Sequence, residues 1–201
     1  METKNAILDI IINLVKGCKM EKSILLDESC GECLYACNYL LNQALRQYAL
    51  PSERILVSEE ANKLWLSLTK DKDIRTFSHR SAIMVESSVP VFVEKYKGAS
   101  KTPYEIGEVK QGDTVIFNDA FTDEHVVPIK VIIKALIALP TLDYESVREV
   151  LSKMYICKVL KKEDHAIKKK SNRSLDYKEV IKTDYLSEGI KVVDFDYGEQ
   201  T

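Results

Sequence analysis

Three consecutive polar residues, Asp123, Glu124 and His125, stand directly before an apolar step that leads to Pro128. An imidazole can take a proton from water, and a divalent cation beside it can stabilise negative charge on a phosphate. The cluster is therefore a candidate catalytic site for the hydrolysis of phosphate esters. His165 is the next histidine along the chain, and folding could bring it to the same site.

The order of acidic residue, histidine, apolar step and proline in residues 123–128 resembles the opening of the HNH (ββα-metal) nuclease motif. The resemblance implies a divalent metal as cofactor, His125 as general base, and Asp123 and Glu124 as its acidic neighbours. The family pattern continues with an Asn and a further His or Asn, and residues 140–150 contain neither type. The competing interpretation is a polar turn in front of a helix that begins at Pro128.

Three cysteines, Cys30, Cys33 and Cys37, have the i, i+3, i+7 spacing that places side chains on one helix face. Thiolates gathered in this way are candidate metal ligands or redox groups. A structural zinc ion takes four ligands, and Cys18 is the candidate for the fourth. Cysteine also packs as a small apolar residue, so a buried helix face is the competing interpretation.

Residues 153–178 form a basic segment, with nine Lys or Arg against three Asp or Glu. Such charges can contact phosphates, so nucleic acid is one predicted partner and an acidic protein surface is another. The segment has one arginine and lacks interleaved aromatic residues, which argues against the reading of base sequence. A solvated face is the third interpretation. The candidate contact residues are Lys161, Lys162, Lys168, Lys169, Lys170 and Arg173.

The composition describes a globular protein. The chain has 201 residues, is 45% hydrophobic and 30% charged, and contains only 7 Gly and 5 Pro, which excludes disordered and collagen-like classes. Its 29 Lys and Arg against 31 Asp and Glu exclude a whole-chain polycation. No segment reaches the roughly 20 apolar residues of a membrane span. With five cysteines, an odd number, we expect a soluble, cytoplasmic protein with reduced thiols and no membrane partner.

The elements that would position these residues fall into a helical part and a mixed part. Apolar periodicity predicts helices over residues 3–15, ending at Gly17, and from about residue 27 to residue 48. Ser58 is the expected N-cap of a third helix. Residues 1–70 are therefore predicted to be mostly helical.

Beyond residue 70 the pattern alternates between strands and helices. Strands are expected at 81–86, 114–118, 155–160 and 190–195, and a loop or hairpin at 97–112. Helices are expected at 128–139, 143–154, 162–169 and 176–187. The predicted fold class is α+β, with a helical subdomain at 1–70 and an α+β subdomain at 71–201, or one continuous domain.

These features favour a binding or regulatory protein that contacts nucleic acid or another macromolecule through the basic segment. The alternative is a metal-dependent nuclease with an HNH-like site around His125. Binding ranks first because a catalytic site needs a nucleophile, a base and a charge stabiliser together, and each candidate lacks one of these parts.

Overall fold

The computed structural model describes residues 2–24, 31–48, 50–70, 72–167 and 173–197, apart from the side chains of 2–5, 20–24 and 31–38. The chain divides into two compact units. The first contains residues 1–51, 127–154 and 170–177, and the second contains residues 52–126, 155–169 and 178–201. Each unit is therefore assembled from segments that are distant in sequence. The division near residue 70, which the sequence suggests, stays a prediction.

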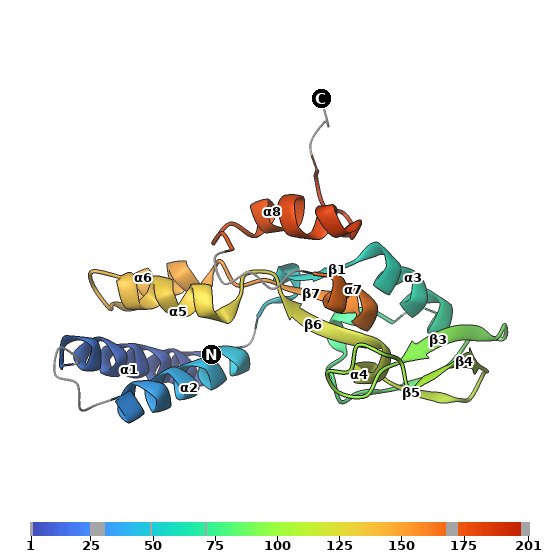
Figure 1. The fold of residues 1–201 in the computed structure, drawn as a ribbon, viewed down its shortest axis with the longest axis horizontal. Coiled ribbons are helices and arrows are strands. Elements are labelled where there is room, and N and C mark those ends of the chain that lie inside the picture. Colours follow the sequence, from blue (N-terminus) through green and yellow to red (C-terminus); the bar gives the residue numbers. More distant parts are fainter. Residues whose placement is uncertain (1, 25–30, 49, 71, 168–172, 198–201) are drawn as a thin grey trace. The chain divides into compact units, whose positions relative to one another are not determined.

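The first unit is helical (Figure 1). Its helices are α1 (Glu2–Ile24), α2 (Gly31–Gln47), α5 (Ile129–Ala138) and α6 (Tyr144–Leu151). Pro128 is the N-cap residue of α5, and the Asp143 carboxylate caps α6 by accepting a hydrogen bond from the Ser146 amide at 2.8 Å. Their apolar faces form one core, which includes Leu8, Ile11, Val15, Leu41, Leu45, Ile132, Leu136 and Val147.

The second unit contains three small sheets. β1 (Ile55–Val57) pairs in parallel with β7 (Ile156–Leu160), which pairs in antiparallel fashion with β6 (Phe121–His125). The other two sheets are two-stranded and antiparallel: β2 (Ala82–Met84) with β5 (Thr114–Ile116), and β3 (Val91–Lys95) with β4 (Glu105–Val109).

Short helices connect these strands. They are α3 (Glu59–Leu68), α4 (Phe117–Ala120) and α7 (Lys161–Ala166), with 3₁₀ turns at Ser52–Arg54 and Ile74–Thr76. The Ser58 hydroxyl caps α3 by accepting a hydrogen bond from the Ala61 amide at 3.1 Å, as the sequence predicts. α8 (Tyr177–Val180) continues into a π turn and a 3₁₀ turn that end at Gly189, which has φ 74°.

The core of the second unit is built around Trp65 of α3. Its indole makes edge contacts with the rings of Phe77, Phe117 and Phe121, at centroid distances of 4.6, 6.3 and 5.9 Å. Burial of the Phe117 and Phe121 rings, which are fully buried, contributes roughly 1.5–3 kcal/mol each. This cluster fixes α3, α4 and β6 relative to one another and so positions the residues of the candidate site.

The structure confirms the α+β class and the helical character of the first 70 residues. Three local predictions are wrong. α1 continues through Gly17 to Ile24, and residues 123–125 lie in strand β6 rather than in a polar turn. The predicted strand at 190–195 is reduced to a single bridge between Ser58 and Val192. In the described residues, no helix has both the length and the apolar character to cross a bilayer.

Candidate functional site

Two neighbouring cavities of the second unit share one lining residue, Lys161. The first, the α3–β3 hollow, has a volume of about 300 Å³. It is lined by Glu60, Lys63, Leu64, Ser67, Val91, Phe92, Glu94, Tyr96, Ala120, Leu160, Lys161 and Lys162. The second, the α7 hollow, has a volume of about 680 Å³. It is lined by Gly98, Ala99, Lys101, Asn118, Thr122, Lys161, Asp164, His165, Ala166 and Ile167.

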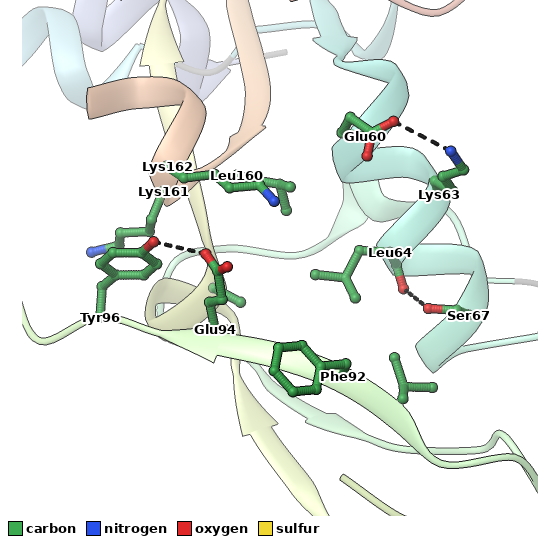
Figure 2. Close-up of a pocket in the computed structure, with 12 residues that line it drawn as sticks. Glu60, Lys63, Leu64, Ser67, Phe92, Glu94, Tyr96, Leu160, Lys161 and Lys162 are labelled. Atoms are coloured by element: carbon green, nitrogen blue, oxygen red, sulfur yellow. Dashed lines mark hydrogen bonds and ion pairs between the residues drawn. The ribbon is translucent and has the colours of Figure 1, made fainter. Parts of the chain in front are cut away.

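The two sides of the α3–β3 hollow follow from simple periodicities. On α3, the lining residues Glu60, Lys63, Leu64 and Ser67 have the i, i+3, i+4, i+7 spacing of one helix face. On β3, alternate side chains point to opposite faces, so Val91 and Val93 are buried while Phe92 points outward. Figure 2 shows α3 on one side of this hollow, Glu94 and Tyr96 on the other, and Phe92 between them.

Phe92 is an exposed aromatic residue, with 60% of its surface open to solvent. Buried apolar side chains, Val91, Ala120 and Leu160, form the adjoining lining. The polar lining carries three lysines and two glutamates. The hollow therefore combines an exposed ring with a small excess of positive charge.

Both glutamates of this hollow have partners of their own. Glu94 accepts a hydrogen bond from the Tyr96 hydroxyl at 2.8 Å, and Glu60 lies 3.4 Å from the Lys63 ammonium in an exposed ion pair. Burial, helped by Glu94, raises the pKa of Tyr96 to about 12, so its hydroxyl stays a donor at neutral pH.

Lys161 is the most buried cation of the two hollows, with 5% of its surface exposed. Its ammonium donates a hydrogen bond to the Gly98 carbonyl at 2.7 Å. Burial lowers the pKa of Lys161, although Asp119 and Asp164 oppose this shift. A buried charge is costly unless it is paired, so this ammonium favours an anion in its surroundings.

The α7 hollow gathers several hydrogen-bonding groups around Lys161. Lys101 comes from the loop after β3, Asn118 from α4, Thr122 from β6, and His165 from α7. The His165 ring makes an edge contact with the Tyr96 ring at a centroid distance of 5.4 Å. Tyr96 lines the α3–β3 hollow, so its contact with His165 and the shared residue Lys161 lie where the two cavities adjoin.

The structure gives Asp123 a structural partner. Its carboxylate lies 2.7 Å from the ammonium of Lys158, its partner across the β6–β7 ladder. The same ammonium donates to the Phe77 carbonyl at 2.7 Å and lies 4.9 Å from the centroid of the Phe117 ring. Glu124 follows on β6, so the strand directs its side chain to the opposite face.

His125 and His165 occupy different places in the second unit. His125 pairs with Ile156 at one end of the β6–β7 ladder, whereas Phe121 pairs with Leu160, the residue before α7, at the other. Four residues of strand separate these ends by about 13 Å. Only His165 lines the α7 hollow. Among the described residues, no three His, Cys, Asp or Glu side chains are placed to hold a metal ion.

The predicted cysteine face lies largely outside the part of the chain whose side chains are described. Cys30 lies outside the described residues, and Cys33 and Cys37 fall in α2 where side chains are not described. Cys18 is buried in the core of the first unit, and Cys157 is buried on β7. The metal and redox interpretations of Cys30, Cys33 and Cys37 therefore stay predictions.

The basic segment is divided among several surroundings. Lys161 and Lys162 line the hollows, whereas Arg173 is buried in the first unit. Lys168, Lys169 and Lys170 lie outside the described residues. Phe92, Tyr96, Lys63 and Lys101 come from other segments and were not predicted from the sequence to belong to the site. The alternating pattern of residues 91–96 was the only local signal for the exposed ring.

Comparison with protein-family models, with curated proteins and with solved structures gives no match for this chain. Its function is therefore inferred from the geometry of the α3–β3 and α7 hollows alone.

Proposed function

We propose that the protein binds single-stranded nucleic acid in the α3–β3 hollow and does not cleave it. The observation that carries this proposal is Phe92, which is 60% exposed in a hollow also lined by Lys63, Lys161 and Lys162. Proteins that bind single strands combine aromatic side chains, on which bases stack, with cations that follow the phosphates.

Stacking on Phe92 favours a single strand over a duplex. A base can stack on Phe92 only when its own face is free, and in a duplex both faces are covered by neighbouring bases. The buried apolar residues Val91, Ala120 and Leu160 beside the ring offer further surface to an inserted base. The lysines on either side then supply the contacts to phosphates.

The surroundings of Asp123 support binding rather than cleavage. Its carboxylate already neutralises Lys158, which is 4% exposed, and is committed to holding β6 and β7 together. The nuclease alternative around His125 stays a prediction of the sequence. An acidic protein surface, the other predicted partner, would use the same lysines and pack against Phe92, so the binding experiment with nucleic acids separates the two partners.

Fluorescence anisotropy of the full chain with labelled single-stranded DNA, single-stranded RNA and a matched duplex tests the proposal. We expect Phe92→Ala to weaken single-strand binding by about 1–3 kcal/mol, the contribution of one stacked base. Lys162→Met should lower the slope of log K against log salt by about 0.7, the value for one phosphate contact. Met84→Ala and Lys110→Met, exposed residues of the same unit outside both hollows, are the matched controls.

Three outcomes would contradict the proposal. The first is the absence of salt-sensitive binding to any of the nucleic acids. The second is binding that Phe92→Ala leaves unchanged, which would show that charge alone holds the strand and that no base stacks on Phe92. The third is cleavage in Mg²⁺ or Mn²⁺ that EDTA and His125→Ala abolish, which would establish the nuclease alternative.

A further inference from the structure

We infer that the α7 hollow holds the phosphorylated end of the bound strand, so that the protein distinguishes a terminal phosphate from a terminal hydroxyl. This inference rests on the proposed function. It assigns the second cavity to a phosphate monoester, while the α3–β3 hollow takes a base and its phosphodiester.

The two cavities are adjacent, which is the first argument. Lys161 lines both, and the Tyr96 ring of the α3–β3 hollow contacts His165 of the α7 hollow at 5.4 Å. A strand that stacks a base on Phe92 therefore has the α7 hollow as its neighbouring site.

The second argument is the chemistry of the lining. Lys101, Lys161, His165, Asn118 and Thr122 bring ammonium, imidazole, amide and hydroxyl groups to one cavity. Ammonium, amide and hydroxyl groups donate hydrogen bonds to phosphate oxygens, and those from cations are the strongest. The single carboxylate of the lining is that of Asp164.

The state of Lys161 adds to this argument. Lys161 is 5% exposed as a whole residue, and its ammonium donates to one described acceptor, the Gly98 carbonyl. An ammonium has three protons to donate, so two remain for an anion. A phosphate monoester carries a charge of about −1.5 to −2 at neutral pH, and is the better counter-charge than a diester with about −1.

The third argument is size. At about 680 Å³ the α7 hollow is larger than the α3–β3 hollow. Cavities that hold small molecules measure about 300–1,000 Å³. The α7 hollow therefore has room for a whole terminal nucleotide, including its base and sugar as well as its phosphate.

The test uses three oligonucleotides of one sequence with an internal label: one with a 5′-phosphate, one with a 3′-phosphate and one with hydroxyls at both ends. We expect one phosphorylated end to tighten binding to the full chain by about tenfold. Lys101→Met and His165→Gln should each bring the ratio of the affinities for the phosphorylated and the hydroxyl-ended strands close to one. Lys110→Met, an exposed lysine outside the hollow, should keep the gain.

The outcomes separate this inference from the proposed function. If the hydroxyl-ended strand binds but neither phosphate tightens binding, the inference fails and the proposed function stands. The inference also fails if the gain in affinity survives both Lys101→Met and His165→Gln. It fails as well if an equal concentration of nucleoside monophosphate displaces the phosphorylated strand completely. If no strand binds, the proposed function itself fails. Thermal melting of each variant shows that it is folded.

Discussion

Two buried ionisable side chains of the second unit, Lys158 and Glu163, have different consequences for stability. Lys158 is an ion-paired cation between two strands, with the Asp123 carboxylate at 2.7 Å. Glu163 is a carboxyl group, 8% exposed, that accepts two hydrogen bonds. Neither residue lines the α3–β3 or the α7 hollow, so their effects on stability are separable from those on binding.

Removing the carboxylate of Asp123 leaves the Lys158 ammonium buried without its counter-charge. We expect Asp123→Ala to lower the free energy of unfolding by about 2–3 kcal/mol, below the full cost of a completely buried pair because Asp123 is partly exposed. Urea unfolding at pH 7 measures this. Glu108→Ala, an exposed carboxylate on β4, is the control and should change stability by less than about 0.5 kcal/mol.

A second substitution shows whether the loss of the Asp123–Lys158 ion pair causes the lower stability of Asp123→Ala. In the Asp123→Ala background, Lys158→Met removes the unpaired charge and should recover part of the lost stability. Asp123→Ala protein that is as stable as the wild type would show that the carboxylate contributes nothing to the fold. Asp123 would then be free for the chemistry that the sequence suggests.

At the scale of elements, Glu163 joins the start of α7 to the start of α3. The Ser58 hydroxyl donates to its carboxylate at 2.6 Å and the Leu160 amide donates to the same oxygen at 2.7 Å. Burial raises the pKa of Glu163 above 4.5, and the hydrogen bonds from Ser58 and Leu160 oppose this without cancelling it. The native state therefore binds a proton at pH values where the unfolded chain has released it.

Because the pKa of Glu163 is raised in the folded protein, the free energy of unfolding should depend on pH. Stability should fall as pH rises from 4.5 to the higher folded pKa of Glu163 and become independent of this group above it. Glu163→Gln removes the titration, so the wild type should lose stability relative to this variant between pH 4 and pH 7. Urea unfolding of both proteins across that range measures the difference. A constant difference, or one of opposite sign, would contradict the assigned shift.

Elements with their own end signals were predictable from the sequence. Ser58 before α3, Pro128 before α5 and Asp143 before α6 each mark a helix start that the structure contains. The strand predicted at residues 155–160 likewise corresponds to β7. These signals are local, so a single sequence is enough to identify them.

Elements that depend on distant partners were not predictable. The polar residues 123–125 form a strand because Lys158 of β7 supplies the matching charge across the ladder. α1 continues through Gly17 because its apolar face packs in the core of the first unit. For the site, the basic segment identified Lys161 and Lys162, but Phe92 comes from a distant hairpin and becomes part of a cavity only after folding.

At the scale of the whole molecule, both hollows belong to one of the two units. The second unit contains α3, β3, β6 and α7, whereas the first is built from α1, α2, α5 and α6. A ligand bound in these cavities contacts elements of the second unit. The helices of the first unit can therefore serve as an internal reference in a binding experiment.

Hydrogen exchange of the full chain can use this reference. With a saturating single strand that has a terminal phosphate, we expect slower amide exchange in α3, β3, α7 and residues 98–101, since these segments line the hollows. Exchange in α1 and α6 should change little. Phe92→Ala should reduce the protection of α3 and β3, and Lys101→Met that of residues 98–101. Protection centred on α1 and α6 would place the binding surface in the first unit and contradict the assignment of both hollows.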